Sequence, residues 1–253
     1  MRELSSKILV SERHYWTEAL LILLAAASFA SINLAATSQP QARTGTIHGR
    51  VRLNGKSPGN VVIRMGVDPM CSKINAGKRV VQAAIVTSAD GGLANVFVKL
   101  EGNFPAAPIP ADPVVIDQRG CIYEPRVVGA RAGQTLQIRN SDPLSHNVHS
   151  VSAYNSFNVG QASAGVVNSF RLKDESAIVQ LKCDVHRWMT AYIGIVNHPY
   201  FAVSSDGGVF EIRNVPVGTH RLQSWHETFG SLSQTVTVKA GATVSVDLAY
   251  TPK

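Results

Sequence analysis

Charged residues make up only 16% of this 253-residue chain, and helical periodicity is nearly absent after residue 44. Because 45% of the residues are hydrophobic, a disordered chain is excluded. A Gly-rich phosphate loop, a nucleophile elbow and a carboxylate pair spaced for acid–base catalysis are all missing from the sequence. No Lys/Arg run or basic patch with interleaved aromatic residues is present, so no nucleic-acid partner is expected.

Short β-branched runs separated by Gly, Pro and Asn/Asp turns predict an all-β fold. The alternating run 46–53 ends at Asn54-Gly55, which predicts a hairpin with 61–65 as its returning strand. Further strands are predicted at 80–86 and 94–100, followed by a proline-rich loop or hinge.

The N-terminal region has no charged residue from 19 to 42, and Ser28-Phe29-Ala30 fits a signal-peptide cleavage site. We therefore expect residues 1–36 to be a signal peptide or an uncleaved membrane anchor, with a linker at 37–44. Both alternatives stay open, because residues 1–18 carry three cations and three anions. In either case we expect the rest of the chain in the periplasm or cell envelope.

Cysteine is scarce, with only Cys71, Cys121 and Cys183. If Cys183 binds a metal, the other two are left as a pair, which an oxidising compartment allows to form a disulfide. The alternative is two unlinked buried thiols. The formal net charge of +7 favours an acidic redox partner or an anionic membrane face, or serves only for solubility.

The segment Cys183-Asp-Val-His186-Arg-Trp-Met189 offers a thiolate, an imidazole and a thioether within seven residues. Upstream, His146 offers a second imidazole. This soft S/N donor set favours one copper ion in a trigonal site, with Met189 as the weak axial ligand. Taken singly, a buried thiol, a surface histidine and a packing methionine are the commoner explanations.

Three neighbours of these residues have expected roles. Asn147 is expected to hydrogen-bond across to the Cys183 loop and hold it. Trp188 either forms a docking and electron-exit surface or is buried in the sandwich. His149 lies three residues after His146, so on a strand it points to the opposite face and is not expected to be a ligand.

Residues 111–200 resemble the cupredoxins, the blue copper proteins, in three features. Residues 131–142 look like the cupredoxin strand before the first ligand, His146-Asn147 matches that ligand and its following Asn, and Cys183–Met189 is similar to an amicyanin-like ligand loop. The resemblance implies one-electron transfer through one type 1 copper.

Residues 201–253 resemble a transthyretin-like or carboxypeptidase-regulatory-like β-domain, through 206–218. The β segment 45–110 precedes the copper domain, and its first part, 45–66, is a candidate to pair with the C-terminal domain. The whole chain is similar to bacterial envelope proteins described as plastocyanin-like or methylamine-utilisation-like.

We therefore expect an all-β protein with a cupredoxin Greek-key sandwich, a small Ig/transthyretin-like sandwich and an N-terminal signal or anchor helix. The expected function is electron transfer to a redox partner protein in the periplasm, without enzyme activity, because a single closed copper site offers no open coordination position. The alternatives are periplasmic copper binding and delivery, or a structural envelope module.

Overall fold

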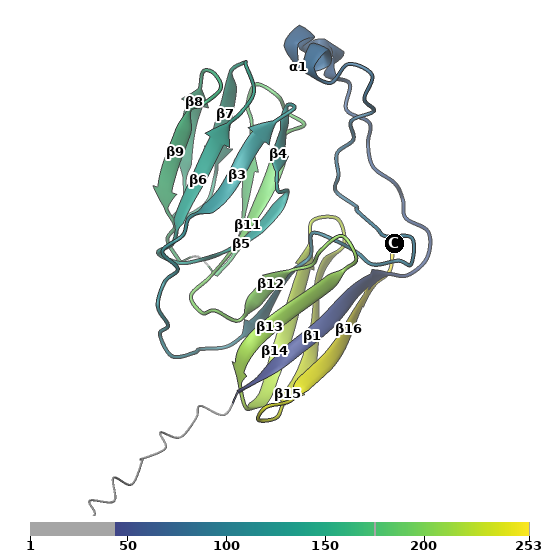
Figure 1. The fold of residues 1–253 in the computed structure, drawn as a ribbon, viewed down its shortest axis with the longest axis vertical. Helices are drawn as coiled ribbons and strands as arrows, with labels where there is room; N and C mark the ends of the chain where they lie inside the picture. The colour runs from purple at the N-terminus through teal and green to yellow at the C-terminus, as the bar shows by residue number, and fades with distance from the viewer. Residues whose placement is uncertain (1–43, 175, 253) are drawn as a thin grey trace, which may run out of the picture. The chain divides into compact units, whose positions relative to one another are not determined.

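The computed structural model describes residues 44–252 except 175, and this part of the chain is nearly all β-strand (Figure 1). The expected signal peptide or anchor at 1–36 lies outside the described residues, as does nearly all of the linker. Among the described residues, no helix is long and apolar enough to cross a membrane.

Sixteen strands and two short helices follow one another in the described residues. In chain order they are β1 (Thr44–Leu53), η1 (Met65–Val67), α1 (Pro69–Ile74), β2 (Phe97–Glu101), β3 (Val114–Arg119), β4 (Ile122–Glu124), β5 (Val127–Arg131), β6 (Thr135–Asn140), β7 (His146–Ser150), β8 (Phe157–Gln161), β9 (Val167–Arg171), β10 (Ile178–Lys182), β11 (Thr190–Val196), β12 (Phe201–Val203), β13 (Val209–Pro216), β14 (Gly218–His226), β15 (Gly230–Val238) and β16 (Thr243–Tyr250).

One sandwich packs the sheet β13-β1-β16 against the sheet β12-β2-β14-β15. Alternate residues of β1 are buried, as expected for a strand with one face on a core. β1 pairs antiparallel with β13 and parallel with β16, so strands from the two ends of the described chain lie side by side (Figure 1). The hairpin predicted after Asn54-Gly55 is therefore wrong.

Residues 54–92, called the excursion below, contain η1 and α1 but no strand (Figure 1). The strands predicted at 61–65 and 80–86 are wrong, since only an isolated bridge joins Val62 to Val81. Val61 and Val62 are exposed and bury no apolar face that could hold a sheet together. α1 begins where the Asp68 carboxylate accepts the N–H groups of Met70 and Cys71, with proline in the first turn.

The second sandwich packs β4-β3-β6-β9 against β5-β11-β10-β7-β8. Its core is built from the inward-facing residues of both sheets, among them Ile116, Leu136, Ile138, Leu181 and Ile193. In the second of these sheets β10 lies between β7 and β11. The start of β7 and the loop after β10 therefore come together at one end of this sandwich.

A smaller apolar cluster joins residues of both sandwiches around Phe97 of β2. Val127 of β5 and Val196 of β11 are buried in it. β11 carries a glycine here, Gly194, and a Cβ at that position would lie 2.6 Å from ring carbons of Phe97. The glycine is therefore required by the close approach of the Phe97 ring.

Candidate metal centre

The strands position the candidate ligands at this end of the second sandwich. His146 is the first residue of β7, and Cys183 follows β10 directly. The loop from Cys183 to Met189 is closed by two backbone hydrogen bonds, in which Met189 N–H donates to His186 O at 2.8 Å and Cys183 N–H donates to Met189 O at 3.3 Å. The loop is thus compact, and β11 begins immediately after it.

His146, Cys183 and His186 converge, and each is at most 2% exposed. The Nδ1 atoms of the two histidines are 3.0 Å apart, Cys183 Sγ lies 3.9 Å from His186 Nδ1, and all three donor atoms fall within 4.8 Å of one another. A metal at about 2.0 Å from nitrogen and about 2.3 Å from sulfur keeps its donors roughly 3.5 Å apart in a trigonal plane. Two imidazoles and one thiolate at these separations fit copper.

Two backbone groups face the sulfur of Cys183. The N–H of Asn147 donates to Sγ at 3.4 Å and the N–H of His186 donates at 3.3 Å. Burial acts to raise the pKa of the Cys183 thiol, but His146 and these N–H groups outweigh it and hold that pKa below its usual value. The site therefore favours the thiolate, which is the form that binds a metal.

His146 is oriented by a carboxylate that the sequence motifs did not single out. Its Nε2–H donates to Asp142 Oδ2 at 2.9 Å, and Asp142 in turn accepts the N–H groups of Gly120 and Cys121. Burial opposes a charge on the His146 ring, but Asp142 and Cys183 raise its pKa to about 9. The carboxylate thus holds the ring with Nδ1 toward His186 and Cys183.

His186 has a corresponding contact on its far side. Its Nε2–H donates to Asp68 Oδ2 at 3.1 Å, and Cys71 Sγ lies 3.5 Å from the same nitrogen. Cys71 forms a disulfide with Cys121, across a sequence separation of 50. The excursion therefore reaches the candidate metal centre and covers His186.

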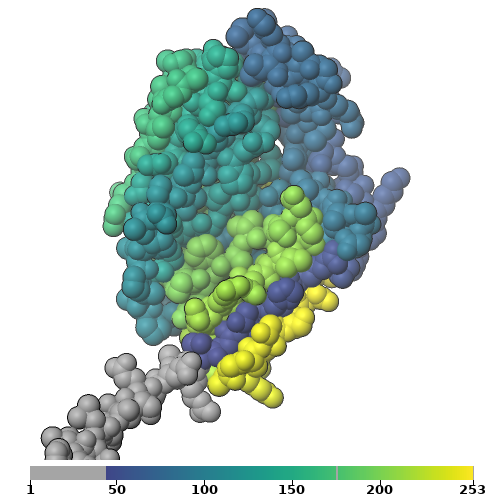
Figure 2. Space-filling model, in the orientation of Figure 1, coloured from purple at the N-terminus to yellow at the C-terminus, as the bar shows by residue number. Residues whose placement is uncertain are grey.

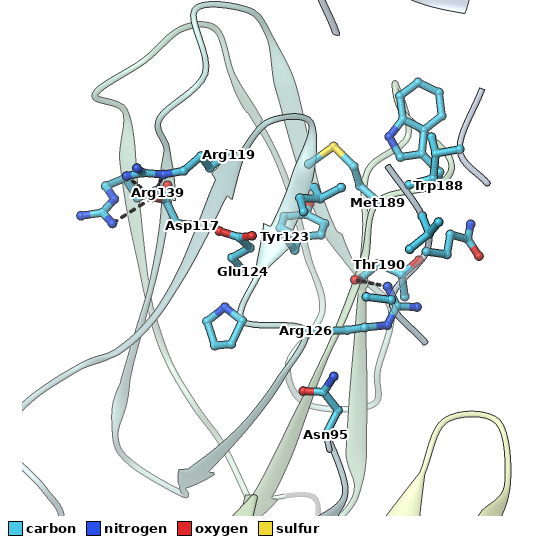
Figure 3. A pocket seen from close by; sticks show the side chains of 16 residues that line it. Asn95, Asp117, Arg119, Tyr123, Glu124, Arg126, Arg139, Trp188, Met189 and Thr190 are labelled. Carbon is cyan, nitrogen blue, oxygen red and sulfur yellow. Dashed lines mark hydrogen bonds and ion pairs between the residues drawn. The ribbon is translucent and has the colours of Figure 1, made fainter. Parts of the chain in front are cut away.

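Met189, the predicted axial residue, and its neighbour Trp188 lie beside a hollow in the protein (Figure 3). Met189 is 1% exposed and belongs to the core cluster that contains Cys183. Trp188 is half-buried, and its Nε1–H donates to Cys121 O at 2.9 Å. Both residues line the hollow, which has a volume of about 590 Å³ and extends past Tyr123 to Arg126.

The structure also shows the positions of Asn147 and His149, which follow His146 in the sequence. Asn147 accepts the N–H of Asp184 through Oδ1 at 3.0 Å, so its side chain bridges β7 and the ligand loop. His149 lies on the opposite side of the strand, with its Nδ1 2.8 Å from the Asp184 carboxylate. His149 is therefore not one of the three residues that converge at the candidate metal centre.

Comparisons with known proteins show similarity to copper proteins over part of the chain. A purple cupredoxin from Nitrosopumilus maritimus aligns at 18% identity over 33% of this chain and 99% of its own, with a TM-score of 0.29. An amicyanin P94A mutant aligns at 18% identity over 39% of this chain and 98% of its own, with a TM-score of 0.31. A copper-containing nitrite reductase from Thermus scotoductus aligns at 15% identity over 38% of this chain and 25% of its own, with a TM-score of 0.31.

No family model matches the sequence, and no curated protein matches it. At these identities and TM-scores the similar structures carry no assignment of a ligand or an activity to this chain. The assignment of the metal centre therefore depends on the donor atoms described above.

Proposed function

We propose that this chain is an exported type 1 copper protein that carries single electrons in the bacterial cell envelope, without enzyme activity of its own. The observation that carries the proposal is the buried convergence of one nitrogen from each of two histidines and the Cys183 sulfur within 4.8 Å. Copper bound by His146, Cys183 and His186, with Met189 as axial ligand, would supply a Cu(I)/Cu(II) couple. We also propose that residues 201–253 belong to a transthyretin-like domain, on the sequence resemblance described above.

The surrounding residues act on the donor groups. Asp142 holds the Nε2 proton of His146, so that Nδ1 is the nitrogen that would bind a metal, in exchange for its own proton. The N–H groups of Asn147 and His186 stabilise negative charge on Cys183 Sγ. Because these groups are hydrogen-bonded in the protein itself, the geometry is held before an ion enters, as a small reorganisation on electron transfer requires.

Electron exchange is proposed to occur with an acidic redox partner protein in the periplasm. The net charge of +7 favours such a partner through electrostatic steering. Trp188 is the proposed exit, since its ring lies 5.1 Å from that of His186 and is half-buried. Anchoring through the N-terminal segment would keep the protein at the membrane.

Voltammetry of the full chain loaded with one copper ion tests this function. A reversible one-electron wave that persists over repeated cycles supports an electron carrier. Loss of copper on each reduction would instead indicate a copper-delivery protein, which needs to release its ion. A chain that binds no copper would support a structural envelope module. Zinc-loaded protein is the matched control, because zinc has no accessible second oxidation state.

A further inference from the structure

The excursion forms a cap that is attached to the second sandwich at several points next to the candidate metal centre. The Cys71–Cys121 disulfide links the two covalently. The Asn75 side-chain amide donates to Gly120 O at 3.0 Å, beside that disulfide. In Figure 2 the excursion (blue) lies against the upper end of the sandwich that carries β3–β11 (teal).

Asp68 uses its two carboxylate oxygens for two different purposes. Oδ1 accepts the N–H groups of Met70 at 2.8 Å and Cys71 at 3.0 Å, which caps α1. Oδ2 accepts the Nε2–H of His186 at 3.1 Å. The residue therefore connects the start of the cap helix to a candidate ligand that is 118 positions away in the chain.

We propose that Asp68 is a positioning residue, which the disulfide-anchored cap brings to His186 to hold its ring with Nδ1 toward Cys183 and His146. The inference rests on the proposed copper site and deepens it. Asp142 provides the same contact for His146, but from within the sandwich. The orientation of His186, in contrast, depends on the excursion, which is distant from His186 in sequence and packs over this ring.

The contact also buries His186. This ring is 2% exposed, with Asp68 and Cys71 at one edge and the Trp188 ring 5.1 Å away. A ring held at its far nitrogen cannot rotate about its Cα–Cβ and Cβ–Cγ bonds without breaking a charge-assisted hydrogen bond. Positioning of this kind is the usual role of a carboxylate next to a metal-binding histidine.

Asp68→Ser in the full chain separates the two roles of this residue. Serine is as good a helix N-cap as aspartate, but its hydroxyl is too short to reach His186. Asp68→Asn keeps the helix cap through its one acceptor oxygen but places an NH2 donor where Oδ2 accepts the Nε2–H of His186. Asp90→Asn is the matched control, because Asp90 also lies on the excursion but pairs with Arg50 of β1. Nitrogen-15 NMR of the histidine rings without metal reports which nitrogen of His186 carries the proton.

We expect the wild type and Asp90→Asn to show the His186 proton on Nε2, with slow exchange. In Asp68→Ser that proton should exchange fast and the ring should populate the other tautomer. Cu(II) affinity should fall about 10- to 100-fold in Asp68→Ser, as is typical when a carboxylate behind a metal-binding histidine is removed. Asp68→Asn should also lower the affinity, because its NH2 group favours the His186 tautomer with the proton on Nδ1, the nitrogen that would bind the metal.

Wild-type tautomer, exchange rate and copper affinity in Asp68→Ser would overturn the inference and leave Asp68 as a helix cap only. If Asp68→Ser fails to fold, the double variant Cys71→Ser/Cys121→Ser, which frees the cap, should show the same change at His186, and a wild-type ring there would overturn the inference. If the wild type binds no copper, the proposed function fails, while the NMR result still decides whether Asp68 positions the ring.

Discussion

The Nδ1 atoms of His146 and His186 lie 3.0 Å apart, and the opposite nitrogen of each ring contacts a carboxylate. Both rings thus present their Nδ1 atoms toward Cys183, with Nε2–H held by the carboxylate. The two carboxylates come from different parts of the chain, Asp142 from the loop before β7 and Asp68 from the excursion. Both rings are therefore oriented so that their Nδ1 atoms can bind the same metal ion, on the side where Cys183 lies.

Replacement of Cys183 by serine should remove the intense visible band of the copper-loaded protein and leave the fold intact. The band requires a thiolate bound to copper, and Cys183 is the free thiol among the described residues. The serine hydroxyl can still accept the N–H groups of Asn147 and His186 that now face Sγ. Visible absorption measures the band, and circular dichroism measures the fold. Asp184→Asn, at the exposed position next to Cys183, is the control. An unchanged spectrum would refute the assignment of this ligand.

Met189→Leu should raise the reduction potential and preserve the blue colour. Leucine conserves the volume of methionine in the core, so the packing cost is small. It removes the thioether, whose weak axial bond tunes the potential without holding the ion. Voltammetry together with the visible spectrum checks this. Loss of copper binding in Met189→Leu would show that the axial role is wrong.

The free energy of unfolding of the protein should depend on pH through His226, the last residue of β14. Burial lowers the pKa of this histidine to about 4, and its Nδ1 accepts the N–H of Thr228. Because the unfolded chain binds this proton more tightly, with a pKa near 6.5, stability is full above about pH 6.5 and falls as the pH drops to about 4, by roughly 1.4 kcal/mol per unit of pKa difference.

His226→Asn keeps an acceptor for the Thr228 N–H and removes the titrating ring. Urea unfolding between pH 4 and 6.5 should therefore show a shallower loss of stability in this variant than in the wild type. Equal pH dependence in the two proteins would contradict the buried neutral state of His226.

Gly194→Ala should destabilise the protein by about 1–3 kcal/mol, the usual cost of overpacking a core. The new methyl group would lie 2.6 Å from ring carbons of Phe97. Gly160→Ala on β8 is the matched control, since a Cβ there meets no atom within 4 Å. Chemical denaturation compares the two. Equal midpoints for both variants would show that Phe97 yields to the added group.

The three converging donors could be predicted from sequence because most of the information is local. Cys183 and His186 belong to one short loop, and their side-chain types already favour copper. Asp68 could not be predicted in the same way, because it lies 118 residues from His186 and an Asp-Pro pair by itself indicates only the start of a helix. Asp142 lies only four residues before His146, but an Asp in a turn before a strand does not by itself indicate a contact with the histidine ring.

The all-β class followed from the short β-branched runs, and the structure shows it. The hairpin predicted for β1 is wrong because Asn54-Gly55 is a strong turn signal by itself, whereas the strands that pair with β1 lie more than 150 positions away. Those strands, β13 and β16, belong to residues 201–253, with which the segment 45–66 was a candidate to pair. Exposed valines at 61 and 62 looked like a strand in sequence, but they have no core to pack on.

Visible absorption and electron paramagnetic resonance of the full chain during titration with Cu(II) test the central claim most directly. We predict an intense blue band with narrow copper hyperfine splitting that saturates at one copper ion per chain. A colourless complex, or one with the wide splitting of ordinary copper sites, would contradict a trigonal site made by His146, Cys183 and His186.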